Sequence, residues 1–168
     1  SAKVHDGWDI GGNANGGYLL ALVSAALCKA TSRQLPIAVS CHYLAPINDA
    51  EVSIETHIVK TGKSFTTATA TMRSGERVIV MATGTCPLAL TLFCDALPPA
   101  MFNISGAPGW VPTVHLSFYL RGIPTGGPVV TEFRTNHLHD GFFEEDGLLW
   151  DASGALVAQS RQLALLPR

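Results

Sequence analysis

The sequence has few charged residues, which excludes one class of partner. Only 14% of its 168 residues are charged, and the formal net charge at pH 7 is −2. Nucleic-acid binding needs a basic face that neutralises phosphates, so we expect no nucleic-acid partner. Because 47% of the residues are hydrophobic, we expect a large buried area that includes an interface between copies of the chain, and therefore a homo-oligomer.

A long hydrophobic run is also lacking. The longest apolar stretch, from Tyr18 to Cys28, contains Ser24 and is too short to cross a bilayer. It has neither the basic flank nor the cleavage site of a signal peptide. We therefore expect a cytoplasmic protein without a membrane partner. The four cysteines have no CxxC spacing and lie in apolar stretches, which is typical of reduced core thiols. They are Cys28, Cys41, Cys86 and Cys94.

Motifs for covalent or phosphate chemistry are missing as well. The sequence has no GxSxG elbow, Walker loop or GxGxxG. His137 and His139 would share one face of a strand, but no third ligand follows at metal spacing, so we expect neither a metal nor a cofactor. His42 and His115 alternate with apolar neighbours, which predicts ordinary strand residues. The acidic run 144–146 predicts a solvated rim.

One apolar helix and four strands are predicted in the first half of the chain. Residues Tyr18–Ala30 are strong helix formers and apolar nearly all round, which predicts a helix buried on all sides. Segments rich in Val, Ile, Thr and Phe follow, separated by tight turns, and predict an antiparallel meander curled round that helix. These segments are Ile37–Ile47, Val52–Lys60, Ser64–Arg73 and Arg77–Cys86.

The same cycle recurs in the second half. A short helix is expected at Asp95–Ile104, and four strands should follow. The expected strands are Pro112–Leu120, Pro128–His139, Gly141–Trp150 and Ala155–Leu166. Two pairs of segments correspond directly, namely Cys41–Ile47 with Ser117–Ile123 and Gly75–Val80 with Gly154–Gln159. The sequence therefore predicts an α+β fold of two tandem units, residues 1–90 and 91–168. The second unit has almost nothing before its helix, so either it lacks an opening strand or a segment near residues 87–91 is missing.

Polar residues found in only one unit are candidates for chemistry. Asp95 stands where the first unit has Asn15 or Gly16, Thr113 where it has Ile37, and Gln162 where it has Thr83. Taken singly, an Asp at a helix start is an ordinary N-cap, and a Thr is an ordinary strand residue. A Gln followed by Leu163 and Leu165 in an apolar strand needs hydrogen-bond partners if it is buried, which makes Gln162 the most informative of the three.

Several segments resemble the TesB-type acyl-CoA thioesterases, which are double-hotdog proteins. The matching segments are WDIGGNANGGYLLAL, CHYLAPI, FCDALPPAMF, VPTVHLSFYLR and EEDGLLWDASGALVAQSRQLALLPR. The resemblance implies two hotdog units, each a helix wrapped by an antiparallel sheet, and an acyl-CoA substrate. It also implies that an Asp, a Thr or Ser and a Gln orient the attacking water. In this sequence they fall on Asp95, Thr113 and Gln162. Members of this family are usually longer than this chain.

Two other functions remain open. A non-catalytic double hotdog would bind acyl-CoA or pair with another subunit without hydrolysis. A hotdog hydratase acting on enoyl thioesters would need an Asp/His pair in one site, and no histidine here is placed by a matching motif. Three arginines are candidates for binding the CoA phosphates on charge alone. They are Arg73, Arg121 and Arg134.

Overall fold

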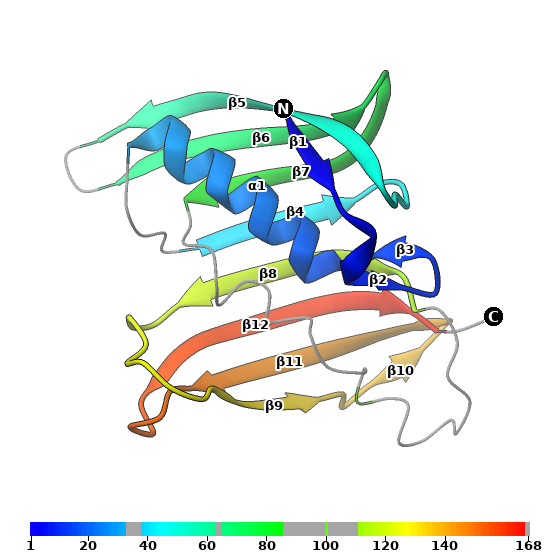
Figure 1. The fold of residues 1–168 in the computed structure, drawn as a ribbon. Helices are drawn as coiled ribbons and strands as arrows, with labels where there is room; N and C mark the ends of the chain where they lie inside the picture. The colour runs from blue at the N-terminus through cyan, green and yellow to red at the C-terminus, as the bar shows by residue number, and fades with distance from the viewer. Residues whose placement is uncertain (33–37, 63–64, 86–99, 101–110, 167–168) are drawn as a thin grey trace.

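The computed structural model describes residues 1–32, 38–62, 65–85, 100 and 111–166 (Figure 1). Within them, one long antiparallel sheet runs through the molecule in the order β1-β5-β6-β7-β4-β8-β12-β11-β10, with β9 beside β11. Helix α1 lies across one half of this sheet. The elements are β1 (Ala2–Val4), β2 (Asp9–Ile10), β3 (Asn13–Ala14), α1 (Gly16–Thr31), β4 (Ala38–Tyr43), β5 (Ala50–Thr61), β6 (Thr66–Ser74), β7 (Arg77–Thr85), β8 (Thr113–Leu120), β9 (Val130–Arg134), β10 (Leu138–His139), β11 (Phe142–Trp150) and β12 (Leu156–Leu165), with a 3-10 turn at Asp6–Trp8.

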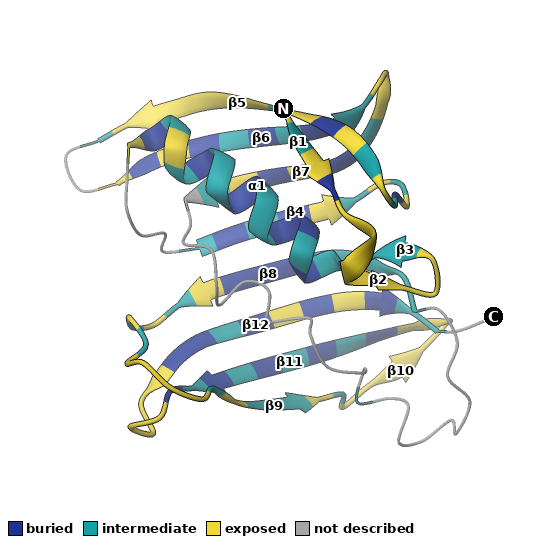
Figure 2. Cartoon of the chain, in the orientation of Figure 1, coloured by how far each residue is buried: buried dark blue, intermediate teal, exposed yellow. Residues whose placement is uncertain are grey.

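Helix α1 confirms the predicted helix, and local chemistry explains both of its ends. The Asn15 side chain caps the first turn by accepting from the Tyr18 N–H at 2.9 Å. At the other end, Ser32 adopts the left-handed conformation with φ 53°. Three side chains of the helix are fully buried and pack against the sheet, namely Leu20, Val23 and Leu27. The prediction of burial on all sides is wrong, because the helix covers only one sheet face and its opposite side stays half-buried (Figure 2).

The strand order differs from the predicted meander at one strand. Strands β5, β6 and β7 do form consecutive hairpins. Strand β4, however, pairs with β7 and β8 rather than with its chain neighbour β5. It therefore lies at the middle of the sheet and joins the two halves. These pairings join residues about forty positions apart (β4 with β7) and more than seventy positions apart (β4 with β8), which local sequence patterns do not specify.

We call the sheet face that carries α1 the inner face and the opposite one the outer face. Side chains alternate between them, and the burial of residues along β4 and along most of β12 follows this alternation (Figure 2). On β4, Cys41 faces inward and is fully buried, whereas its neighbour Ser40 faces outward. The Ser40 Oγ lies 2.8 Å from His115 Nε2 and 2.9 Å from Ser117 Oγ. The centroids of the His42 and His115 rings, also on the outer face, are 4.7 Å apart.

Strands β7 and β12 share an irregularity that reveals how the two halves of the sheet correspond. Ile79 is an extra residue on β7 opposite β6, and Val157 is an extra residue on β12 opposite β11. The bulge carbonyls of Ile79 and Val157 accept from the N–H groups of Leu44 and Arg121, both at 2.8 Å. Five residues after each bulge stand Gly84 and Gln162.

The correspondence predicted from the sequence is therefore one residue out of register. Gly84, not Thr83, matches Gln162, because Gly84 pairs with Val39 as Gln162 pairs with Leu116. A slip of one residue reverses the face of every side chain in a strand. For the same reason Cys41–Ile47 does not match Ser117–Ile123, since Cys41 faces inward and Ser117 outward.

The predicted strand Pro128–His139 is in fact two strands, β9 and β10. The backbone N–H groups of Asn136 and His137 donate to the Glu144 carboxylate at 3.0 and 3.2 Å. A side chain thus replaces the ladder partners of this stretch and ends the first strand.

Several predictions concern residues outside the described ones. They are the helix at 95–104 apart from Ala100, the residue Asp95, the boundary between units at 90–91, the missing segment near 87–91, Cys86 and Cys94. Among the described residues, no helix is long and apolar enough to cross a membrane.

Candidate active site

Thr113 and Gln162 lie together on the inner face. They belong to the neighbouring strands β8 and β12, and the Thr113 hydroxyl donates to the Gln162 carbonyl oxygen at 3.4 Å. Gln162 is only 3% exposed. The prediction that this Gln needs partners is confirmed, and the first of them is a residue predicted for the same site. The third predicted member, Asp95, is outside the described residues.

A β-bulge brings Thr113 to this face. His115 pairs with Leu163, but Thr113 pairs with Ala164, so Val114 is an extra residue in β8. Regular alternation would place Thr113 on the outer face together with His115. The extra residue reverses the side-chain direction, and Thr113 points inward with Ala164. Bulges often redirect a side chain next to an active site, and the bulge at Val114 redirects the side chain of Thr113.

Glu145 is a third polar residue of the site and was not predicted. It is paired with Gln162 across strands β11 and β12 and is 4% exposed. Its Oε1 accepts from Gln162 Nε2 at 3.4 Å, and its Oε2 accepts from the Ala100 backbone N–H at 2.6 Å. The expectation that residues 144–146 form a solvated rim is therefore wrong for Glu145. The residue faces inward because it shares the two-residue period of the buried Phe143 and Leu149.

The acidic residues beside Glu145 have a different environment. Burial raises the pKa of Glu145, and the Ala100 N–H only partly opposes this effect. Burial would also raise the pKa of Glu144, but the backbone N–H groups of Asn136 and His137 bring it below the ordinary value. Asp146 forms an ion pair with Arg161, 2.8 Å from the carboxylate oxygen to Nε. Only the middle carboxylate of the run is thus held in a buried, weakly compensated position.

The surface around the three residues is closely packed. A Cβ on Gly147 would lie 2.3 Å from the Ser160 Oγ and 2.8 Å from a ring carbon of Phe133, so this ring rests directly on the glycine. Phe143 and Ala164 are buried on the same face. A hydroxyl, a carboxamide and a carboxylate therefore meet beside the apolar side chains of Phe143 and Ala164. This combination can hold a polar molecule such as water in a defined orientation.

The histidines take no part in this cluster. His42 and His115 lie on the outer face, away from Gln162. Burial, and to a lesser extent the charge of His42, lowers the pKa of His115. His137 and His139 are exposed at the edge of the sheet. Among the described residues, the Asp/His pair of a hydratase is therefore not seen next to Thr113 and Gln162.

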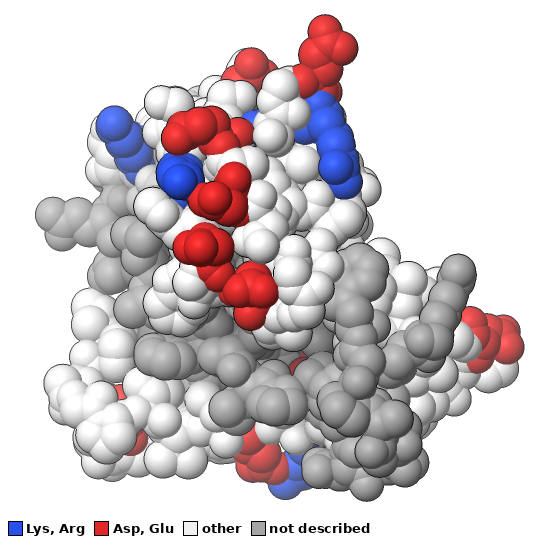
Figure 3. Space-filling view, turned by 45° about the vertical axis from the view of Figure 1, so that its right-hand side comes forward, with Lys and Arg blue, Asp and Glu red and all other residues white. Residues whose placement is uncertain are grey.

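The three arginines suggested for CoA phosphates are not brought together. Arg73 donates to the Glu76 carbonyl at 3.2 Å, and Arg121 donates to Gln159 Oε1 at 2.6 Å. Arg134 is paired with Glu132. Figure 3 shows a band of acidic side chains on the face that it presents. Lys3 forms an ion pair with Asp49 at 3.0 Å.

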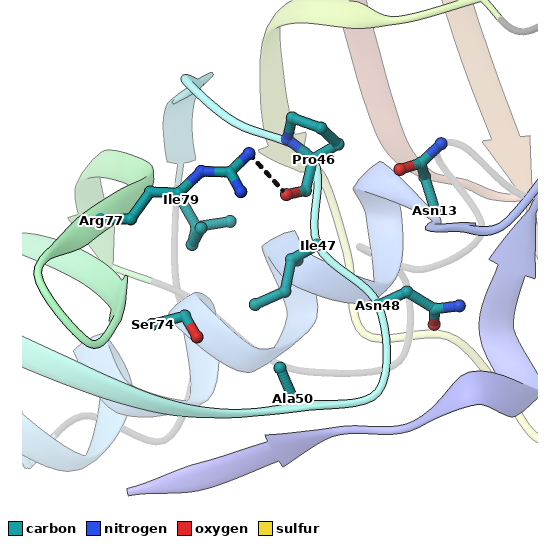
Figure 4. A pocket seen from close by; sticks show the side chains of 8 residues that line it. All are labelled: Asn13, Pro46, Ile47, Asn48, Ala50, Ser74, Arg77 and Ile79. Atoms are coloured by element: carbon teal, nitrogen blue, oxygen red, sulfur yellow. Dashed lines mark hydrogen bonds between the residues drawn. The ribbon is translucent and has the colours of Figure 1, made fainter.

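A separate cavity of about 380 Å³ opens at the end of the first half of the sheet (Figure 4). Arg77 reaches across it and donates to the Pro46 carbonyl at 3.0 Å. The guanidinium is thus already engaged by the backbone. The cavity is lined by Asn13, Pro46, Ile47, Asn48, Ala50, Ser74, Arg77 and Ile79, and shares no residue with the Thr113 cluster.

Comparison with protein-family models shows which family the chain belongs to. A model of the acyl-CoA thioesterase C-terminal domain matches residues 52–166, a range that includes Thr113, Glu145 and Gln162. A model of the acyl-CoA thioesterase N-terminal domain matches residues 4–86. The chain belongs to the acyl-CoA thioesterase family. Over 86 residues this chain is 37% identical to uncharacterized proteins of Mycobacterium tuberculosis and Mycobacterium bovis, a match covering 50% of the chain and 29% of each relative.

Solved structures show the same fold. A protein from Thermobifida fusca described as a putative thioesterase II superposes with a TM-score of 0.93 at 25% identity, covering 99% of this chain and 91% of its own. A hotdog-fold protein from Alicyclobacillus acidocaldarius has a TM-score of 0.86 at 16% identity, with 99% and 92% covered. An acyl-CoA thioesterase II, TesB2, from Mycobacterium marinum has a TM-score of 0.70 at 12% identity, with 93% and 90% covered. The chain therefore has a hotdog fold.

Proposed function

We propose that this protein hydrolyses acyl-CoA thioesters to a free acid and CoA. The observation that carries the proposal is the contact between Thr113 and Gln162 on the buried inner face. These residues match the polar positions of the family's catalytic set, and the Val114 bulge is needed to bring them together. Membership of the thioesterase family supports the reaction class.

We further propose that the fold is a double hotdog of two tandem units. The matched bulges at Ile79 and Val157 support it, as do their matching hydrogen bonds to the chain after β4 and β8. Ser40 also pairs with Ser117 where β4 and β8 meet, as expected if an approximate two-fold axis passes between them. We place the boundary between the units near residues 90–91. A homo-oligomer is expected to show as a solution mass that is a multiple of the chain mass.

The proposed chemistry needs no covalent intermediate. Asp95 takes a proton from a water molecule, whose oxygen attacks the thioester carbonyl carbon. The carbon–sulfur bond then breaks, and the departing CoA sulfur receives the proton, so that one water is consumed for each acid and thiol formed. Thr113 and Gln162 hold the water by hydrogen bonds in attack geometry.

A panel of acyl-CoA chain lengths with detection of free thiol tests the proposal. The wild-type protein should release CoA from at least one chain length. Asp95→Asn should lower kcat by about 10²–10⁴-fold, the contribution of a general base. Gln162→Ala should lower it by about 10²-fold through misplacement of the water. Gln159→Ala is the matched control, since this Gln lies on the same strand but faces outward beside Arg121.

Binding separates the enzyme from a non-catalytic acyl-CoA-binding protein. Under the proposal, Asp95→Asn retains affinity for acyl-CoA while it loses turnover. If the wild-type protein binds acyl-CoA but hydrolyses no chain length, the non-catalytic function is correct and the enzymatic one is wrong.

A further inference from the structure

We propose that Glu145 is a positioning residue that fixes the direction of the Gln162 carboxamide, and that it does so only as a carboxylate. This inference rests on the proposed thioesterase function, because it concerns the orientation of a water-holding group. It adds to that function a residue outside the predicted Asp95, Thr113 and Gln162 set, and a dependence on pH that originates in the site itself.

The direction of a carboxamide is decided by its neighbours, since its two ends differ only in donating or accepting. An ionised carboxylate has no proton to donate, so Glu145 can face only the NH₂ end of Gln162. The carbonyl end must then face Thr113, and the hydroxyl of Thr113 donates to it at 3.4 Å. Thr113, Gln162 and Glu145 thus form a chain of hydrogen bonds in which each donor points toward Glu145.

The two oxygens of Glu145 are both used. Oε2 accepts from the Ala100 N–H at 2.6 Å, and Oε1 accepts from Gln162 Nε2 at 3.4 Å. A carboxylate serves two donors at once, whereas a carboxamide would turn its own NH₂ toward one of them. Glu145 is also placed rigidly, because it is paired with Gln162 in the β11–β12 ladder and is 4% exposed.

Protonation would remove the constraint. A carboxylic acid can donate to the Gln162 carbonyl oxygen, and the carboxamide can then turn over and present its NH₂ to Thr113. The hydrogen bonds would then be donated from Glu145 to Gln162 and from Gln162 to Thr113, and the water would lose the groups that orient it. Burial raises the pKa of Glu145, so this change should begin above the ordinary value of 4.5.

The other charged groups of the neighbouring strands face away from Glu145. The strand register places them on the outer face. There Arg161 forms an ion pair with Asp146, and Asp146 lies opposite Arg134 in the β11–β9 ladder. Thr135 follows Arg134, and its hydroxyl is buried without a hydrogen-bond partner among the described residues. The charged outer-face residues on these strands are Glu144, Asp146, Arg161, Glu132 and Arg134. No described ion pair therefore offsets the burial of Glu145.

The test compares Glu145→Gln with Glu144→Gln. Glu144 is the matched control, because it is the same residue type one position earlier on the other face. In acyl-CoA hydrolysis, wild type should show a loss of kcat on acidification that begins above pH 4.5. Glu145→Gln should lower kcat by about tenfold or more with little change in KM. The contribution of Glu145 to the acidic limb should be lost, which leaves the limb set by the general base Asp95 alone. Glu144→Gln should keep the wild-type pH profile.

A double substitution shows whether Glu145 acts through Gln162. In the Gln162→Ala background, adding Glu145→Gln should have no further effect on kcat. If the two effects multiply instead, or if Glu145→Gln keeps the wild-type rate and pH profile, the inference is wrong.

A measurement without substrate separates this inference from the proposed function and serves even where a variant folds poorly. In wild-type protein, the ¹⁵N and ¹H shifts of the Gln162 side-chain NH₂ should titrate with a midpoint above 4.5. The Gln159 amide is the internal reference and should not follow the same curve. A Gln162 signal that does not titrate overturns the inference, whereas a titrating signal in a protein that hydrolyses no thioester leaves it standing and refutes only the hydrolase proposal.

Discussion

Substitution of Gly84 by alanine should destabilise the protein strongly. Gly84 pairs with Val39 in the β4–β7 ladder and has φ +147°, a conformation that L residues rarely adopt. A Cβ there would lie 2.2 Å from the Ala38 carbonyl oxygen and 2.8 Å from the Val39 Cα. Both of these atoms are backbone, so no side chain can move aside. The central strand β4 itself would have to shift by about 1 Å to reach ordinary contact.

The magnitude follows from two contributions. The backbone conformation costs about 1–3 kcal/mol for a residue other than glycine. Overpacking against a well-ordered neighbour costs about 1–3 kcal/mol more. The total, about 2–6 kcal/mol, is a large part of the 5–15 kcal/mol typical of a folded domain. For a chain of this size it corresponds to a fall in Tm of roughly 2–4 °C for each kcal/mol.

Urea unfolding followed by circular dichroism measures this effect, and two other glycines separate its causes. Gly154 has φ +81° with nothing within 4 Å of an added Cβ, so its alanine variant carries the conformational cost alone. Gly126 has neither positive φ nor close neighbours, and its alanine variant should stay within about 0.5 kcal/mol of wild type. If Gly84→Ala were no less stable than Gly154→Ala, the close approach of β4 and β7 would be wrong.

Three further outcomes are expected. The pKa of His115 in the folded protein lies below 6.5. The contribution of the neutral ring to stability is therefore present above pH 6.5 and is lost as the pH falls through the folded-state pKa. His115→Gln should accordingly reduce the acid-induced shift of the urea midpoint. Asp151 accepts from Thr125, Ser153 and the Ala155 N–H, which holds its pKa well below 3.8. Its contribution is therefore present above pH 3.8 and lost below it, and Asp151→Asn should lower the midpoint at pH 7 and weaken the dependence on acid. Phe118→Ala, at a fully buried site, should cost about 3–5 kcal/mol in the same urea assay.

Much of the secondary structure was predictable because local patterns determine it. Helix α1 was found from its strong helix formers, and its predicted range of Tyr18–Ala30 falls within Gly16–Thr31. Most strands were located to within a few residues from their β-branched residues and turns. The position of β4 beside β7 was missed, because pairing of distant segments depends on the packing of the whole sheet.

The site was only partly predictable, for reasons that lie in register. Gln162 was found because a buried amide in an apolar strand requires partners. Simple alternation places Thr113 on the wrong face, since nothing in the residue types marks Val114 as a bulge. Glu145 was missed because the apolar residues on both sides of β11 hide which of its faces is buried. Phe142 and Leu148 suggest one face, and Phe143 and Leu149 the other.

The two halves of the sheet differ in the room that they leave at matched positions. Val39 and Gly84 form a cross-strand pair in the first half, and Leu116 and Gln162 form the matching pair in the second. At Gly84 the neighbouring backbone excludes even a methyl group. At Gln162 a whole carboxamide extends between Thr113 and Glu145. The position of Gly84 can therefore hold no polar side chain, because the close approach of the β4 backbone requires glycine there. Only the matched position in the second half of the sheet has room for one, and Gln162 occupies it.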